Sequence, residues 1–419
     1  MKGFRRGLAA LLTVCLCLLL SACQGNPREK GEEAGVSRGL LIGYDRFVTM
    51  ADTSPCSAGN IAIMADIAKD FVPDMISVAR RTDEPATVSG LEELIRDTFR
   101  EAGPADTSWL YISTHGIQWD EDGEPRTALL LSDGESEEAL LPETLRGILD
   151  GVPGRKVVIL DACHSGAAVS ALRGPAYQLL VSCAPEEDSF FWISPATDLY
   201  AETGNGYFTA ALDTALRASS PEQLDPDGSG TVSARECAAR IRAICGVSTA
   251  AGYPEDREKP LFHVHGETQH PVRGLEFDPV IRKGDDVYLS FHFTVTDPVR
   301  LEYRMVTRKD GAWDFDGGTT KADDGRIGTR RGWLSPGDKK RSIRISAEDA
   351  GGDGESLLIV ISRDAAGKPS PEGSCVITAA AVTEGVGEAP SRWAAPPYCR
   401  RCEAQHRENP DSVGFAARW

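Results

Sequence analysis

Short apolar runs alternate with helix-like patterns over the first two thirds of the chain. Four runs have the length and composition of buried strands, at residues 39–43, 109–113, 157–160 and 177–182. In the segments between them, apolar residues recur every three or four positions, as on one face of a helix. Strands separated by helices predict an α/β fold with a mostly parallel sheet that is covered on both faces.

Several helix boundaries are also suggested by the sequence. Asn60 is expected to cap a helix, because a run with apolar residues at helical spacing follows it. Ser89 and Glu92 have the spacing of a capping box. Further helices are expected at residues 143–149 and 207–216.

The pattern changes after Pro271, where the helical spacing disappears. Apolar residues then alternate with polar ones, most clearly at Val287, Leu289, Phe291, Phe293 and Val295. Such alternation, interrupted by turns rich in Gly and Asp, is typical of strands with one buried face. We expect residues 271–378 to form a β-sandwich of the immunoglobulin-like type. Residues 379–419 are polar and are expected to form a disordered tail.

The N-terminus has the pattern of an export signal. A basic start and an apolar run fill residues 1–22, and Cys23 follows the sequence Leu-Ser-Ala. This ending resembles the lipobox of bacterial lipoproteins, which implies that Cys23 is lipidated and becomes the new N-terminus. Cleavage near Ala22 that leaves a free Cys23 is the alternative. Residues 23–38 are expected to form a flexible tether. From the export signal and Cys23 we expect a lipid anchor in the bilayer and an extracytoplasmic location.

Composition limits the classes of function. The chain has 419 residues, with 45 Lys and Arg against 63 Asp and Glu, a formal net charge of −18. Hydrophobic residues make up 41% and charged residues 26%, as in an ordinary globular protein. The acidity argues against nucleic-acid binding, which needs clustered basic side chains, and it suits basic partners.

Two residues that follow predicted strands carry candidate chemistry. His115 comes just after the strand at 109–113, and Cys163 just after the strand at 157–160. The carboxyl ends of parallel strands are where ligands and catalytic groups gather. A thiolate is a strong nucleophile, and an imidazole can take and return its proton. Either residue alone could be structural, but the pair favours catalysis.

The surrounding residues resemble a known family. Ser-Thr-His-Gly at 113–116 resembles the S-G-H-G motif of metacaspases, and Asp-Ala-Cys-His-Ser-Gly at 161–166 resembles their D-S-C-H-S-G motif. The resemblance to caspase-like cysteine peptidases covers residues 39–268 and implies a three-layer α/β/α sandwich. It implies that Cys163 is the nucleophile and His115 the general acid/base, with the N–H groups of Gly116 and Cys163 as the oxyanion hole. Thr114 departs from the motif, which has Gly there.

The same resemblance suggests a specificity. Metacaspases and clostripain have an Asp two positions before the nucleophile, in the pocket for the residue preceding the scissile bond. Asp161 occupies this position, which implies cleavage after Arg or Lys. Glu187 and Asp188 are candidates for a second acid of the pocket, although the match there fails residue by residue. Asp161 could instead cap the following turn.

Residues 225–236 fit the pattern of a calcium-binding EF-hand loop. Oxygen-bearing side chains occur at the ligand positions, with Gly at position six: Asp225, Asp227, Ser229, Thr231 and Glu236. Against this, Pro221 interrupts the incoming helix, and Ser233 with Glu236 also forms an ordinary capping box. The sequence leaves calcium binding open, and no cofactor is expected to be required.

These observations lead to one reading and two competitors. We expect a membrane-anchored cysteine endopeptidase acting on proteins or peptides with Arg or Lys before the scissile bond. One competitor is a catalytically silent caspase-like lipoprotein that binds a partner or acts as a scaffold. The other is a thiol–disulfide exchanger, which needs a pair such as Cys399 and Cys402 near the sheet. Those two cysteines, followed by His406, lie in the predicted tail, where a disulfide or two free thiols is expected.

Overall fold

The computed structural model describes residues 35–194, 202–254, 260–264, 270–283, 286–309, 312–314, 333–346, 356–364 and 367–377. The described residues from Val36 onward form one compact unit. The predicted signal peptide, Cys23, Cys399, Cys402 and His406 lie outside the described residues.

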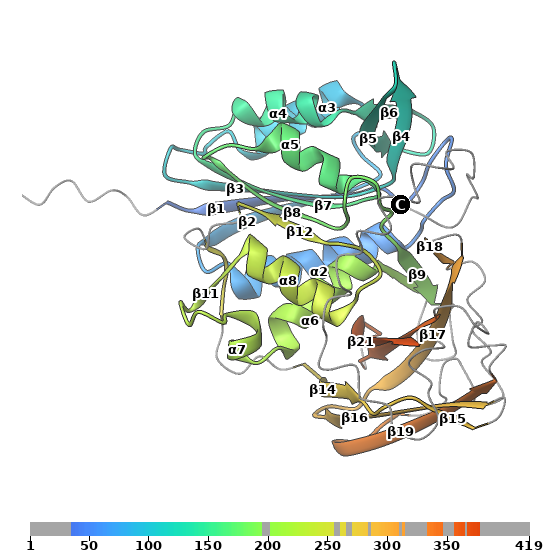
Figure 1. Ribbon diagram of the computed structural model, residues 1–419. Coiled ribbons are helices and arrows are strands. Elements are labelled where there is room, and N and C mark those ends of the chain that lie inside the picture. Colours follow the sequence, from blue (N-terminus) through green and yellow to red (C-terminus); the bar gives the residue numbers. More distant parts are fainter. Residues whose placement is uncertain are drawn as a thin grey trace, which may run out of the picture. The chain divides into compact units, whose positions relative to one another are not determined.

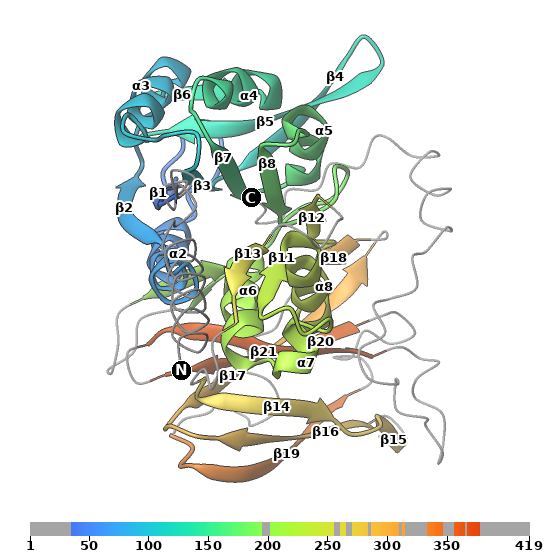
Figure 2. The same ribbon diagram turned by 90° about the vertical axis from the view of Figure 1, so that its left-hand side faces the viewer.

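A six-stranded sheet forms the centre of the first part of the chain (Figures 1 and 2). The strand order is β12-β8-β7-β3-β1-β2, and every neighbouring pair is parallel except β12 with β8. The prediction of a mostly parallel sheet is therefore confirmed. Its strands are β1 (Ser37–Gly43), β2 (Met75–Thr82), β3 (Thr107–Ser113), β7 (Arg155–Asp161), β8 (Tyr177–Val181) and β12 (Ala251–Tyr253).

Helices cover both faces of this sheet (Figure 1). Those on one face are α3 (Val88–Thr98), α4 (Pro142–Asp150) and α5 (Ala168–Leu172), and those on the other are α2 (Cys56–Phe71), α6 (Tyr207–Ala218) and α8 (Ala234–Ile244). Successive strand residues join opposite cores: Leu110 and Val158 pack with α3 and α4, whereas Tyr111 and Ile159 pack with α2 and α6. This alternation explains why the strands are apolar throughout.

Two predicted helix starts are wrong. Thr87, and not Ser89, caps α3, because its hydroxyl accepts the Gly90 N–H at 3.1 Å. Helix α2 begins at Cys56, so Asn60 lies within it and its side chain contacts the sheet instead. Pro221 does interrupt the chain before the EF-hand-like loop, because it starts a separate short helix, α7 (Pro221–Leu224).

The sequence did not predict several short strands. A three-stranded antiparallel sheet consists of β4 (Gly116–Glu121), β5 (Glu124–Ser132) and β6 (Glu137–Leu140), and two pairs are β9 (Phe191–Ser194) with β10 (Thr203–Gly206) and β11 (Thr231–Ser233) with β13 (Pro260–His263). The exposed part of β4 and the half-polar edge strand β2 lack the apolar runs that identify buried strands.

The later strands form two antiparallel sheets that share one core, which confirms the predicted sandwich. One sheet has β14 (Val272–Phe277), β15 (Ile281–Lys283), β16 (Asp286–Val295) and β19 (Gly337–Ser346), and the other has β17 (Arg300–Lys309), β18 (Ala312–Asp314), β20 (Ser356–Arg363) and β21 (Pro369–Ile377). Phe291 of β16 and Tyr303 of β17 meet in this core, with ring centroids 5.8 Å apart. As predicted, the apolar residues of β16 are buried and alternate with more exposed ones.

None of the helices in the described part of the chain has the length and apolar character needed to cross a membrane.

Candidate active site in the sheet domain

Strand pairing brings His115 and Cys163 to the same edge of the sheet. In the parallel pair β3 and β7, Ser113 lies opposite Asp161. His115 and Cys163 each follow two residues later, and the Thr114 N–H donates to the Asp161 carbonyl at 3.2 Å, which continues the pairing past the strand ends. Both residues lie just beyond the carboxyl ends of two strands of one sheet, as predicted, and the structure shows that these strands are neighbours.

The two segments touch at Gly116. A Cβ atom added there would lie 1.8 Å from the carbonyl oxygen of Cys163 and 3.1 Å from its nitrogen. Only a residue without a side chain permits this approach of the two backbones. The N–H groups that the resemblance assigns to an oxyanion hole therefore belong to adjoining segments.

Replacing Gly116 by Ala is expected to lower the free energy of unfolding by about 2 kcal/mol, because the two backbones must separate. Gly147 of α4 provides a matched control, since nothing lies within 4 Å of its added Cβ. Gly147→Ala is expected to raise the same free energy by about 0.5–1 kcal/mol, because Ala favours a helix more than Gly does. Chemical denaturation of both variants measures the difference, and equal effects would contradict the close contact.

The His115 ring is held by the segment that follows β1. Its Nε2 lies 2.9 Å from the carbonyl oxygen of Ala51, and the Phe47 ring packs against it in a T-shaped arrangement with ring centroids 4.4 Å apart. Because a carbonyl oxygen only accepts, Nε2 carries the hydrogen of the neutral ring, and Nδ1 has the lone pair. Thr114, the departure from the motif, points its hydroxyl at the Leu130 carbonyl of β5.

The Cys163 thiol is enclosed by the segment around Ser189. Cys163 is 2% exposed. The Ser189 N–H donates to its Sγ at 3.3 Å, and the thiol lies 3.6 Å from the Ser189 carbonyl oxygen. Burial raises the pKa of the Cys163 thiol well above its usual value, and the negative charge of Asp188 raises it further. In this enclosed arrangement the thiol keeps its proton, so attack by a thiolate requires a base.

Asp161 lies in a buried polar network that Ser189 connects to the Cys163 thiol. Its carboxylate receives hydrogen bonds from Ser189 Oγ at 3.0 Å, Thr209 Oγ1 at 2.7 Å and Asn60 Nδ2 at 3.3 Å. Tyr111 extends the network through its hydroxyl, 2.7 Å from Thr209 Oγ1. Burial raises the pKa of Asp161 to about 6. These partners are neutral, so the network supplies donors but no positive charge for the carboxylate.

Comparison with known families identifies this part of the chain. The family model described as the caspase domain matches residues 39–232. These residues belong to the caspase domain family. The expectation of a caspase-like cysteine peptidase fold is thereby confirmed.

Three solved structures resemble the chain distantly. A protein from Geobacter sulfurreducens is 18% identical and matches 55% of this chain and 99% of its own, with a TM-score of 0.38. A secreted C11 cysteine protease from Bacteroides thetaiotaomicron, in complex with an irreversible peptide inhibitor, is 15% identical and matches 36% of this chain and 49% of its own, with a TM-score of 0.27. OgpA from Akkermansia muciniphila, in complex with an O-glycopeptide, is 12% identical over 83% of this chain and 95% of its own, with a TM-score of 0.21. No curated protein matches the chain.

In the caspase domain, the two other predicted pocket acids lie on the segment that ends at Ser189. The Glu187 carboxylate accepts from the Thr249 N–H at 2.7 Å and from the Thr249 hydroxyl at 2.8 Å, so it braces this segment. Asp188 is half-buried and acts electrostatically on Cys163. Asp188 is therefore better placed than Glu187 to meet a charged group at the thiol.

His164 directs its side chain to this same segment. Its ring Nδ1 lies 3.1 Å from the Pro185 carbonyl oxygen, and its backbone N–H donates to the Glu187 carbonyl at 2.8 Å. The residue has a left-handed backbone with a φ of 57°. These contacts indicate that His164 has a structural role in its motif.

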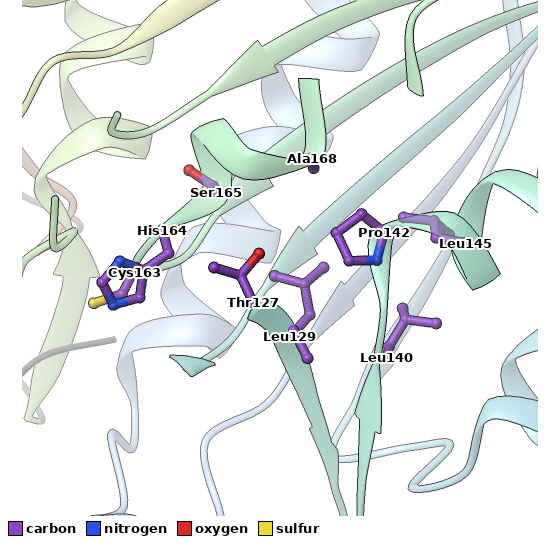
Figure 3. A pocket seen from close by; sticks show the side chains of 10 residues that line it. Thr127, Leu129, Leu140, Pro142, Leu145, Cys163, His164, Ser165 and Ala168 are labelled. Atoms are coloured by element: carbon purple, nitrogen blue, oxygen red, sulfur yellow. The ribbon is translucent and has the colours of Figure 1, made fainter. Parts of the chain in front are cut away.

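A hollow lies beside the segment of Cys163 to Ser165 (Figure 3). It is lined mainly by apolar side chains, which include Leu129, Leu140 and Pro142. Figure 3 shows the sulfur of Cys163 pointing away from Leu140 and Pro142. The hollow therefore adjoins the backbone of Cys163 and not its thiol.

Sequence reasoning missed the groups that hold the site residues. Ser189, Thr209 and Asn60 bind Asp161, and Ala51 orients His115. For Asn60 a signal was available, because it lies four residues before Met64 on a face that is otherwise apolar. The predicted EF-hand residues are also brought together, because Asp225, Asp227 and Glu236 have carboxylate oxygens within 4.8 Å of one another.

Proposed function

We propose that this protein is a membrane-anchored, extracytoplasmic cysteine endopeptidase that cleaves after Arg or Lys, with Cys163 as nucleophile and His115 as general acid/base. The observation that carries the proposal is the contact of Gly116, which follows His115, with the backbone of Cys163. Ser189 links the Cys163 thiol to the buried carboxylate of Asp161. The proposal is supported because the backbone segments that carry the thiol and the imidazole adjoin at the ends of two neighbouring strands.

The residues have distinct roles in the proposed reaction. His115 Nδ1 takes the proton of Cys163, and Sγ attacks the carbonyl carbon of the scissile bond. The resulting oxyanion is stabilised by the N–H groups of Gly116 and Cys163. When the intermediate collapses, the C–N bond breaks, and the amine leaves with the proton from His115. Water, deprotonated by His115, then hydrolyses the thioester and restores the thiol.

Substrate access requires the segment around Ser189 to move. Ser189 bonds both the Cys163 sulfur and the Asp161 carboxylate, so a single displacement would uncover the nucleophile and the specificity acid together. A guanidinium or ammonium group entering there would replace the hydroxyl donor and meet the charges of Asp161 and Asp188. That positive charge would also lower the pKa of Cys163, because it offsets the effect of Asp188.

A peptide panel tests the proposed activity. Fluorogenic peptides that differ only in the residue before the scissile bond are incubated with the full chain, with and without calcium. Cleavage after Arg or Lys supports the proposal. Cleavage after Asp would keep the caspase fold but contradict the role of Asp161.

The burial of Cys163 favours one alternative, a silent caspase-like lipoprotein that binds a partner or acts as a scaffold. No cleavage of any peptide, together with no reaction of Cys163 with peptide-based alkylating probes, would favour this alternative. The thiol–disulfide alternative has less support. Cys56, Cys163, Cys183, Cys237 and Cys245 carry free thiols, and burial raises the pKa of each one.

The proposed lipid anchor rests on the sequence of residues 1–23. When the protein is produced in a bacterium that processes lipoproteins, we expect it to enter the detergent phase on Triton X-114 partition, because a diacylated Cys23 adds two acyl chains. Cys23→Ala is expected to move it to the aqueous phase. Equal partition of the two proteins would contradict the anchor.

A further inference from the structure

We propose that residues 225–236 bind one calcium ion, with the side chains of Asp225, Asp227, Ser229 and Glu236 and the backbone carbonyl of Thr231 as ligands. The site lies between α7 and α8, apart from Cys163 and His115, and does not depend on peptidase activity.

The first observation is the spacing of the carboxylates. Oxygens of Asp225, Asp227 and Glu236 all lie within 4.8 Å of one another. Calcium binds oxygen at 2.3–2.6 Å, so two ligands on opposite sides of one ion are about 5 Å apart. The Ser229 hydroxyl donates a hydrogen bond to the Thr231 carbonyl at 3.0 Å, so these two oxygens already lie close together.

The second, independent observation is a buried oxygen without a partner. Glu236 is 7% exposed, and its Oε2 accepts hydrogen bonds from the Ser233 N–H at 3.0 Å and from the Ser233 hydroxyl at 2.8 Å. Its Oε1 is buried and has no hydrogen-bond partner among the described residues. A buried carboxylate oxygen is costly unless a donor or a cation satisfies it, and here the nearby acids offer no donor. The capping box therefore explains one oxygen of Glu236 and leaves the other for a cation.

The backbone already has the turns that such a loop needs. Gly228 and Gly230 have φ values of 70° and 79°, so both are in the left-handed region that favours glycine. The Asp225 carboxylate accepts from the N–H groups of Ser229 at 3.0 Å and Gly230 at 2.7 Å, which fixes the loop around its first ligand.

EF-hands usually occur in pairs, in which the short strands of the two loops pair with each other. In this chain, which has one such loop among the described residues, β13 pairs with the short strand of the loop. Strand β11 includes Thr231, and its Val232 pairs with Phe262 of β13 in an antiparallel arrangement. Val232 and Phe262 are fully buried in the core shared with α6 and α8. The loop is thus anchored to the domain without a second EF-hand, and Pro221 does not prevent its formation.

Calcium titration of the full chain tests the proposal. The Cys163→Ala background is used, so that the result does not depend on peptide cleavage. We expect one ion per chain by isothermal titration calorimetry, with a Kd of about 10⁻⁶ to 10⁻³ M. Calcium at 100 times Kd is expected to raise the Tm over that in a chelator by about 5 °C or more.

Two variants and a control isolate the site. Asp227→Asn changes an exposed ligand, and Glu236→Gln keeps an oxygen for the capping box. Each is expected to weaken calcium binding at least tenfold, whereas the Tm in chelator stays equal or rises because like charges are removed. Glu222→Gln, an exposed acid in the neighbouring α7, is expected to bind calcium like the parent.

The proposal is overturned if calcium does not bind to the parent protein and does not raise its Tm. It is also overturned if both variants bind calcium as tightly as the parent, or if magnesium binds as tightly as calcium. Circular dichroism identifies a variant that is unfolded in chelator. In that case, calcium binding by the other variant decides whether the proposal holds.

Discussion

Cys163→Ala is expected to reduce cleavage after Arg or Lys by at least about 10³-fold, because the reaction then has no nucleophile. His115→Ala is expected to cause a loss of similar size, since the raised pKa of Cys163 keeps the thiol protonated without a base. Both losses should appear in kcat, and the double variant should lose little more than either single one. Steady-state kinetics on the Arg peptide of the panel measures them.

Cys237→Ala is the matched control for the nucleophile. Cys237 is a buried, free cysteine of α8, and burial raises its pKa above the usual range. We expect Cys237→Ala to keep kcat within about twofold, since it lies outside the site. Retained activity in Cys163→Ala would contradict the account, regardless of the kcat measured for Cys237→Ala.

Asp161→Asn is expected to lower kcat/KM for Arg and Lys peptides by about 100-fold, because a charged side chain of the substrate would lose its buried partner. Cleavage after a neutral residue such as Leu, where measurable, should change far less. The ratio of the two kcat/KM values is therefore the informative quantity. It separates a specificity role from general damage to the site.

The same residue predicts a pH dependence. The pKa of Asp161 is raised to about 6 by burial, so its carboxyl is charged above this pH and neutral below it. The Arg-to-Leu ratio of kcat/KM is expected to fall as the pH drops through 6, by about tenfold at pH 5 relative to its value at pH 8. His115 and Cys163 serve both substrates, so their titration cancels in the ratio. A ratio that is constant with pH would contradict a substrate contact with Asp161.

Asp45→Asn is the matched control for Asp161. Asp45 is a second buried acid with a raised pKa, and its carboxylate caps α2 by accepting from the N–H groups of Ser57 at 2.8 Å and Ala58 at 3.0 Å. We expect its replacement to reduce stability by about 1 kcal/mol and to leave the Arg-to-Leu ratio unchanged. An equal change of the ratio in both variants would show that it reports stability and not specificity.

The sequence predicted the sheet and the placement of the site because both depend on local patterns. The runs around Leu110 and Val158 are apolar on both faces, and a parallel pairing of two such strands places His115 and Cys163 together. Helix starts were predicted less well. Thr87 and Asn60 show why, because a polar residue before an apolar run can be a cap or a buried partner of a distant group.

The partners of the site residues could not be predicted. Ser189 meets Cys163 across 26 positions of the sequence, and Thr209 meets Asp161 across 48. No periodicity links such positions, since the contacts arise only when the loops fold back over the sheet. The EF-hand-like loop is the contrary case, because its ligands lie within twelve residues and the structure brings its three acids together.

The most direct test of the central claim is to alkylate the full chain with an irreversible probe that carries Arg before its reactive group, and to map the labelled residue by mass spectrometry. The account predicts a label on Cys163, competed by Arg peptides and reduced in Asp161→Asn, with no label from the matching Asp probe. A label on another cysteine, or equal labelling by both probes, would contradict it.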